Sequence, residues 1–385
     1  MTRWRIDSRH QDDLNLALGL LFPAVSGLLL FGWRCVGVWA LIIVGATAAR
    51  VILSRFRTWI ATPGMLSLLV QCVVVSLFVP ATLFDVDRSL LQPDARWPAL
   101  LAVGAFLALA DWAVRRFGRG RAQAAVLTAA LLTLAVPWLV DTRRVLRPQQ
   151  LGAGDILDVR TEERSSGTAE PWVDLRPAPA PVLETPPAAA ALQDFVDRRP
   201  PPGRTNQTVA RLLGDDLPPL EDLVIGGHPA AIGRGSLVAL LIGGLFLVYR
   251  GVTPLRVPAL ALLACYATLV VLPLPAGVGG GNTRRWLFER DPRVGWAAGL
   301  TLVHYLLASS ALPVAATFLA TRPDVRPAGR GAAALFAVTF GLLAAAATVF
   351  VSVTGGALLA LLVTQLLWPR VLTRANLVIE PNRAG

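Results

Sequence analysis

The sequence contains no lysine, and it is poor in charge of either sign. Of its 385 residues only 16% are charged, whereas 54% are hydrophobic and the mean hydropathy is +0.57. A soluble globular protein carries more charge and less apolar sequence than this. The composition therefore excludes an ordinary soluble enzyme and indicates an integral membrane protein.

Cysteine and histidine are also scarce, with three of each. Cys35, Cys72 and Cys265 each stand alone in an apolar run, without the C-x-x-C spacing of a metal or redox site. We expect them to be buried as small hydrophobic side chains. The sequence also has no Walker loop, no dinucleotide fingerprint and no nucleophile elbow. It thus presents no metal site and no catalytic residue of its own.

What the chain does have is ten apolar runs of nearly membrane-spanning length. A hydrocarbon core about 30 Å thick needs roughly 20 apolar residues per helix. The first five runs cover 14–31, 35–53, 64–84, 98–114 and 122–140, and the second five cover 236–249, 257–274, 294–320, 331–349 and 353–368. The predicted fold is an all-α membrane protein with a five-helix half at 1–140 and another at 234–385.

A polar segment at 141–233 separates the two predicted halves. It carries 13 of the 29 prolines, which argues against long helices. One stretch just beyond Thr185, at 188–196, has the composition of a short helix that follows a proline pair. We expect a proline-rich excursion with one short helix in it.

The arginines predict the orientation in the membrane. They concentrate in the short connections that share a side with both termini, as cytoplasmic connections do. Both termini are therefore expected in the cytoplasm of a bacterial inner membrane, with 141–233 outside it. This placement also explains the net charge of +11 without a nucleic-acid partner. The N-terminus has no cleavage site, so the first apolar run is expected to remain as a helix.

Two five-helix blocks of opposite orientation suggest an inverted repeat, in which sites often lie near broken helices. The third run of each block contains a potential break, at Pro80 and at Ser309 to Pro313. Prolines also occur in unbroken membrane helices, so the sequence leaves both interpretations open.

A few polar residues stand at membrane depth. Asp111 is either a functional acid or, as we favour, the partner of Arg115 in an i,i+4 ion pair. His304 is expected to be a core residue, with proton relay or ligation as the alternative. Side chains expected to donate interhelical hydrogen bonds are Gln71, Gln123 and Gln365.

Three stretches, together with the five-loop-five plan, resemble the NqrB/RnfD family. This family comprises the membrane protein RnfD of Rnf-type electron-transport complexes and the membrane protein NqrB of the sodium-translocating NADH:quinone reductase. The stretches are LALGLLFPAVSGLLLFGWRCVGVWAL, GGHPAAIGRGSLVALLIGGLFLVYRGVTPLRVP and TFLATRPDVRPAGRG. The resemblance comes from their order and spacing, since no single motif is intact.

The resemblance implies that the outer loop carries FMN, esterified through its phosphate to a threonine. Thr185 in VLETPP is the counterpart, although Leu183 and Glu184 replace the family's Gly-Ala. Glu184 would place a negative charge beside the incoming phosphate. The alternative is a threonine that carries no cofactor.

The resemblance also implies flavin contacts, with FMN or riboflavin, at three further places. They are the glycine-rich helix entry with Gly233, Arg234 and Ser236; the turn with Gly118 and Gly120; and Thr321. Arg234 and the arginines of the turn are equally explained as membrane-surface anchors. Arg322 stands where the family has an aspartate, which weakens the expectation of sodium translocation.

The function that these features favour is a membrane subunit of a flavin-dependent electron-transport complex. It would pass electrons through flavin to a quinone or a redox partner, with coupling to ion translocation implied by the resemblance. Other membrane and redox subunits would be its partners in the lipid bilayer and would oxidise NADH. The alternative is a scaffold without flavin, or a small-solute transporter, on the same fold.

Overall fold

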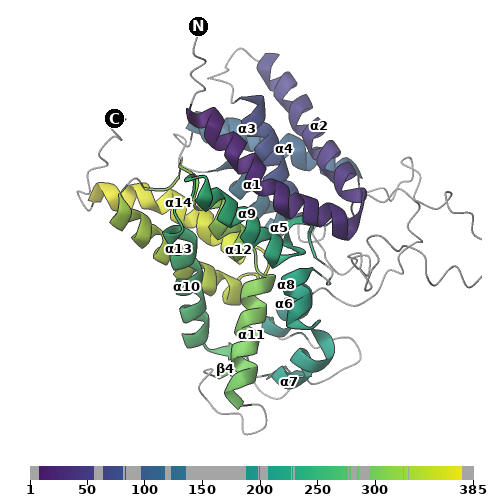
Figure 1. The fold of residues 1–385 in the computed structure, drawn as a ribbon, viewed down its shortest axis with the longest axis vertical. Helices are drawn as coiled ribbons and strands as arrows, with labels where there is room; N and C mark the ends of the chain where they lie inside the picture. Colours follow the sequence, from purple (N-terminus) through teal and green to yellow (C-terminus); the bar gives the residue numbers. More distant parts are fainter. Residues whose placement is uncertain are drawn as a thin grey trace, which may run out of the picture.

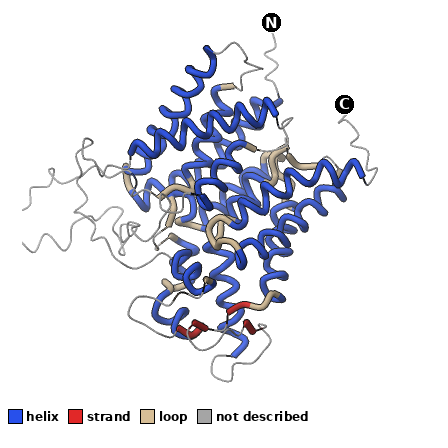
Figure 2. The backbone as a smooth tube through the Cα atoms, turned by 180° about the vertical axis from the view of Figure 1, so that it is seen from behind, coloured by secondary structure: helices blue, strands red, loops and turns tan. Residues whose placement is uncertain are grey.

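The fold is almost entirely helical. A computed structural model describes residues 8–55, 64–80, 83, 97–117, 123–135, 188–197, 199, 207–226, 228, 230–275, 277–278, 284–285, 295–323, 325–327 and 329–374, and the structural statements below refer to these residues. Figure 2 shows helices throughout, with a few short strands at one end of the molecule. This agrees with the predicted all-α class.

The first helical block contains α1 (Ser8–Phe31), α2 (Arg34–Arg55), α3 (Met65–Ser76), α4 (Trp97–Phe117) and α5 (Ala124–Ala135). Its most extensive contact joins α2 to α4. A Cβ atom added at Gly45 would collide with the carbonyl oxygen of Leu101, and one at Gly104 would collide with that of Ile42. The two helices therefore approach backbone to backbone, as small residues allow in membranes.

The second block contains α9 (Leu237–Tyr249), α10 (Arg256–Val271), α11 (Gly295–Ser309), α12 (Leu312–Val314), the π-helical turn η6 (Ala315–Leu319), α13 (Arg330–Phe350) and α14 (Gly356–Arg374). Here the most extensive contact joins α10 to α13. Gly341 of α13 faces the carbonyl oxygen of Ala261, so this pair is also closely packed.

The two blocks meet through their first and their last helices. α1 packs on α9, and α5 packs on α14 (Figure 1). A Cβ atom at Gly243 would meet the carbonyl oxygen of Gly19, and one at Gly355 would meet the side chain of Thr133. Glycines thus bring the blocks into direct contact at both places.

Four helices are long and apolar enough to cross a membrane: Gln11–Phe31, Arg34–Arg55, Trp97–Arg116 and Arg330–Phe350. A fifth candidate span is the pair Ala297–Ser309 and Leu312–Leu319, which is bent by 58°. The remaining predicted spans coincide with apolar helices of 10–17 residues. The chain is therefore a multi-pass membrane protein with four or five candidate spans by helix length.

The third helix of each block is interrupted, as the sequence suggested. α3 ends at Ser76, and the described residues from Leu77 to Pro80 are not helical. In the second block the break lies between Ser309 and Leu312. α3 is consequently much shorter than the predicted span at 64–84, because the helix ends at Ser76, four residues before Pro80.

The short helices of the described polar segment fold against the second block, whereas its last turn packs on α1 of the first block. The segment contains α6 (Ala188–Val196), α7 (Val209–Arg211), the π-helical turn η4 (Leu212–Asp216), α8 (Leu220–Ile225) and the 3-10 turn η5 (Ile232–Arg234). The strands β1 (Gln207–Thr208) and β3 (Gly277–Val278) pair antiparallel, as do β2 (Leu274–Pro275) and β4 (Arg284–Arg285). The helix expected at 188–196 is confirmed.

Two short hydrogen bonds are among those that join this segment to the membrane helices. The Gln193 side-chain oxygen accepts from the Val353 N–H at 2.6 Å, just before α14. The Tyr305 hydroxyl of α11 donates to the Pro218 carbonyl oxygen at 2.6 Å.

All three cysteines are buried and free, which confirms that they pack as small hydrophobic side chains.

Candidate cofactor site at the entry to the second helical block

The turn η5 fills the gap that the interrupted α3 leaves. The Ile232 N–H donates to the Val79 carbonyl oxygen at 3.2 Å, and the Gly233 N–H donates to that of Leu77 at 3.0 Å. Carbonyl groups at the end of a helix have no intrahelical donor and need another partner. The entry to the second block therefore satisfies the open backbone of the first.

The glycines of this entry are explained by close packing. A Cβ atom on Gly233 would meet the side chain of Leu77, and one on Gly235 would lie 2.9 Å from Leu30. Gly226 has a φ of +121°, a conformation that side chains rarely adopt. The glycine pattern alone is thus no evidence for a ligand.

The N-terminus of α9 keeps free donors. The Ser236 hydroxyl accepts from the Ala239 N–H at 3.3 Å and donates to the Val224 carbonyl oxygen at 3.3 Å, so it is a helix cap with both roles in use. Within the described residues no partner is found for the N–H groups of Leu237 and Val238. Together with the helix dipole, these two groups favour an anion.

Arg234 adds a positive charge next to this helix end. It is largely buried, and no salt bridge within the described residues involves it. Loss of hydration lowers the pKa of its guanidinium to about 10, so the group stays charged at neutral pH. A largely buried cation without a counter-ion in the described part of the chain, beside a helix N-terminus, is suited to a phosphate.

His228 is close enough to Arg234 for the charge of the arginine to act on it. No motif in the sequence predicts a role for this histidine, which stands in Gly-Gly-His-Pro. Its Nδ1 lies 3.0 Å from the Asp222 carbonyl oxygen, and its side chain is buried. Burial lowers the pKa of the imidazole, and the charge of Arg234 lowers it further. The neutral form of His228 is therefore favoured near Arg234.

Thr321 lies toward the other end of α9. Its hydroxyl donates to the Thr317 carbonyl oxygen at 2.7 Å, and the Thr317 methyl group faces Gly244. Gly244 is eight residues from Ser236, which corresponds to about 12 Å along a helix. The structure thus separates Thr321 from Arg234 and Ser236 and uses its hydroxyl within the broken span.

Thr185, Gly118 and Gly120, the other residues expected at the cofactor, lie outside the described residues. Their proposed roles stay predictions.

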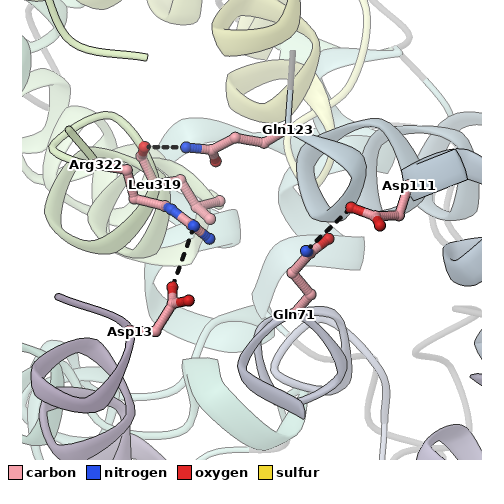
Figure 3. Close-up of polar contacts among 6 residues, drawn as sticks. All are labelled: Asp13, Gln71, Asp111, Gln123, Leu319 and Arg322. Atoms are coloured by element: carbon pink, nitrogen blue, oxygen red, sulfur yellow. Dashed lines mark hydrogen bonds and ion pairs between the residues drawn. The ribbon is translucent and has the colours of Figure 1, made fainter. Parts of the chain in front are cut away.

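A second group of polar contacts lies around the end of η6 (Figure 3). Arg322 pairs with Asp13 of α1 at 3.4 Å. The Gln123 side-chain N–H donates to the Leu319 carbonyl oxygen at 3.0 Å, and that of Gln71 donates to Asp111 at 3.3 Å. The contacts of Arg322 and Gln123 tie the first block to the broken span of the second.

Most of the predicted polar contacts are present. Asp111 accepts from Arg115 at 2.9 Å, which confirms the i,i+4 ion pair. Gln71 and Gln123 are interhelical donors as expected, whereas the side-chain oxygen of Gln365 accepts from the Gln123 N–H at 3.2 Å. Three buried amide atoms, Gln71 Oε1, Gln123 Oε1 and Gln365 Nε2, have no partner in the described structure.

The expectation for His304 was wrong. Its side chain is exposed on α11 rather than part of the core, and its ring contacts Tyr266 at a centroid distance of 5.5 Å. Both sequence neighbours, Val303 and Tyr305, are buried, so the apolar run did not reveal which face His304 occupies.

Comparison with known proteins supports the resemblance seen in the sequence. A family model described as the NQR2, RnfD, RnfE family matches residues 168–375, which is more than half of the chain. No curated protein matches the chain. The matched region begins in the polar segment and includes η5, Arg234 and the whole second block down to α14.

Proposed function

We propose that this chain, which belongs to the NQR2, RnfD, RnfE family, passes electrons through a bound flavin within an Rnf- or Nqr-type membrane complex. The observation that carries the proposal is the guanidinium of Arg234, unpaired among the described residues, beside the free N–H groups at the start of α9. The acceptor would be a quinone or a redox partner. Other subunits would supply the NADH and iron–sulfur chemistry.

FMN fits the residues of this entry in charge. Its phosphate would lie at the N-terminus of α9, where Arg234 and the N–H groups of Leu237 and Val238 offer donors. The neutral His228 avoids a second buried charge there. When bound, the isoalloxazine ring would supply one- and two-electron transfer, while the chain would bind and orient it. Thr185 is the proposed attachment residue, and riboflavin is the alternative ligand, without a phosphate.

The proposed architecture is ten helices in two inverted halves, with both termini in the cytoplasm and 141–233 outside. Three features support the two related halves. α2 packs on α4 as α10 packs on α13, the third helix is broken in each block, and the blocks meet α1 to α9 and α5 to α14. Contacts between corresponding helices are what a two-fold relation between halves would produce.

Coupling to ion translocation, which the family resemblance implies, would have to use residues other than Arg322. The charges of Arg322 and Asp13 offset each other across 3.4 Å. A cation therefore gains little net attraction from this pair.

A second candidate function is a membrane scaffold without flavin. The observation that favours it is that Gly233, Ser236 and Thr321 already have their polar groups engaged inside the protein. In such a scaffold, Arg234 would pair with a lipid phosphate or a residue outside the described part.

Flavin content decides between the two functions. The protein would be purified after co-expression with a flavin transferase, denatured, and examined for in-gel flavin fluorescence, with Thr185→Val as the matched variant. We expect fluorescence that the substitution abolishes. Fluorescence that survives Thr185→Val would overturn the attachment residue, and the absence of bound or released flavin would favour the scaffold.

A further inference from the structure

The connection between α8 and α9 closes on itself. A Cβ atom added at Gly226, just after α8, would lie 2.8 Å from the carbonyl oxygen of Gly235, just before α9. The middle of the connection is held on the interrupted α3 by the backbone hydrogen bonds of η5. Between the two glycines His228 and Arg234 are the only ionisable residues, and each stands near one end. The closure therefore brings both of them to the junction of α8 and α9.

α8 anchors His228 close to the start of α9. The Asp222 carbonyl oxygen lies 3.0 Å from His228 Nδ1, and the Val224 carbonyl oxygen accepts from the Ser236 hydroxyl at 3.3 Å. These two carbonyl groups are two residues apart, which is less than one helical turn. Since Ser236 caps α9, the imidazole lies close to the N–H groups that have no partner within the described residues.

The contact with Asp222 fixes the tautomer of His228. A carbonyl oxygen can only accept, so Nδ1 carries the proton and donates it to this hydrogen bond. Burial and the charge of Arg234 lower the pKa of the imidazole, which favours the neutral ring. In a neutral ring protonated at Nδ1, Nε2 is an acceptor. The described residues offer Nε2 no donor, although the side chain of His228 is only 5% exposed.

The junction thus combines donors with one acceptor. The guanidinium of Arg234 and the N–H groups of Leu237 and Val238 can only donate, so they suit a phosphate. Nε2 of His228 can only accept, so it requires a hydroxyl or an N–H group. An unpaired buried acceptor costs free energy, and a ligand that brings the missing donor is therefore favoured. A phosphate ester with a hydroxyl group on a nearby carbon offers both groups in one molecule.

We infer that His228 is a ligand-binding residue and that the junction selects the phosphate ester of a polyol. Arg234 and the start of α9 hold the phosphate, and His228 Nε2 accepts a hydrogen bond from a hydroxyl group near it. The inference rests on the phosphate site of the proposed function. It adds a selectivity that Arg234 does not supply, because a guanidinium does not distinguish one phosphate ester from another.

Two sources carry this chemistry in a membrane. One is the ribityl phosphate of FMN, which is the ligand that the proposed function predicts. The other is the glycerol phosphate headgroup of phosphatidylglycerol.

The first test compares FMN with a flavin analogue whose phosphate is carried by a plain alkyl chain without hydroxyl groups. Dissociation constants are measured for the full chain with Thr185→Val, so that neither ligand becomes attached at that residue. Two substitutions separate the roles of the ring nitrogens. His228→Asn keeps a donor at the position of Nδ1, and His228→Gln keeps an acceptor at the position of Nε2.

We expect His228→Asn to weaken FMN binding by about fivefold, the factor that corresponds to one neutral hydrogen bond, and to leave the analogue unaffected. His228→Gln should keep most of the affinity for FMN. A histidine with a purely structural role would give the reverse order, because only His228→Asn keeps the bond to Asp222. That order, or equal weakening of both ligands by His228→Asn, would overturn the inference.

Arg234→Gln separates the inference from the proposed function. It should weaken FMN and the analogue equally, because both carry the phosphate. If FMN binding depends on Arg234 but is the same in His228→Asn, the inference fails and the proposed function stands.

A lipid experiment covers the case in which no flavin binds. The protein is reconstituted with phosphatidylglycerol or with phosphatidylmethanol, whose headgroup has no hydroxyl, and retained lipid is measured by native mass spectrometry. Preferential retention of phosphatidylglycerol that His228→Asn abolishes would support the inference with a lipid as ligand and refute the proposed flavin. Equal retention of the two lipids by a protein that binds no flavin would overturn both.

Discussion

The two helical blocks share one packing scheme. They differ in how the backbone groups that are left open at the break of the third helix find hydrogen-bond partners. In the first block, the open carbonyl groups at Leu77 and Val79 accept N–H groups from η5, which belongs to the second block's entry. In the second block, Ser310 closes the break locally, accepting from the Leu312 N–H at 3.2 Å and donating to Leu307 at 2.9 Å. The candidate cofactor site therefore lies where one block completes the other.

The two ends of α9 also differ in charge. The entry at η5 holds Arg234 with no ion pair in the described part of the chain, whereas Arg322, at the other end of α9, is paired with Asp13. Two largely buried arginines thus have different chemistry. The first is available to an anionic ligand, and the second holds the blocks together.

The largest expected effect comes from breaking the shared packing scheme. Gly104→Leu in α4 places a side chain against the Ile42 carbonyl oxygen, and Gly341→Leu in α13 places one against that of Ala261. We expect each to destabilise the protein by about 3 kcal/mol or to prevent folding, because backbone cannot move aside. Size-exclusion profiles and thermal unfolding in detergent measure this.

The matched control is Gly331→Ala, where no other part of the described structure brings an atom within 4 Å of the added Cβ. This substitution should be neutral or slightly stabilising, since alanine favours a helix over glycine. If Gly104→Leu and Gly341→Leu behave like the control, the shared packing of the two blocks would be refuted.

A smaller effect is expected when the paired arginine loses its partner. Asp13→Asn removes the carboxylate charge that lies 3.4 Å from the Arg322 guanidinium, and the side chains of Arg322 and Asp13 are only 11% and 18% exposed. We expect a loss of about 2 kcal/mol of unfolding free energy, reduced from the fully buried case by the remaining solvent contact.

The exchanged pair Asp13→Arg with Arg322→Asp should recover part of that loss, and the thermal midpoints of the variants measure it. A double variant no more stable than Asp13→Asn would show that the attraction between these two charges does not hold the blocks together.

The smallest effect concerns pH at the entry. Burial and Arg234 lower the pKa of His228 below its usual value near 6.5. Above that value His228 is neutral in both the folded and the unfolded chain, and no stability is lost. As the pH falls below about 6.5, the unfolded chain binds the proton first, so folding stability decreases.

We therefore expect the thermal midpoint to fall as the pH is lowered from about 7 to about 5, and His228→Asn to fall less, with His304→Gln as the matched control. Equal pH dependence in His228→Asn and the unsubstituted protein would show that the pKa of His228 is not lowered at the entry.

Much of the helical plan could be predicted because apolar runs are direct evidence of membrane helices. α9 and α6 begin and end within a residue of the expected positions, and the break at Ser309 was visible as a Ser-Ser-Ala-Leu-Pro run inside an overlong apolar stretch. Asp111 and Arg115 were predictable because helix spacing alone brings them together.

What could not be predicted depends on contacts between distant parts of the chain. Asp13 and Arg322 are 309 residues apart, and nothing local links them. The early end of α3 depends on η5, which offers its open carbonyl groups other donors. Thr321 was grouped with Arg234 by resemblance alone, and the length of α9 is what separates them.

In the proposed function, Arg234 and the start of α9 bind the phosphate of a flavin. The direct measurement is the dissociation constant of FMN and of riboflavin for the Thr185→Val protein, with Arg234→Gln added and with Arg256→Gln as matched control. Losing a charge-assisted hydrogen bond of about 1.5 kcal/mol corresponds to roughly tenfold in affinity. We predict that Arg234→Gln weakens FMN binding by that factor and leaves riboflavin binding unchanged, and that Arg256→Gln changes neither. FMN binding that is unaffected by Arg234→Gln, or absent altogether, would contradict the proposal.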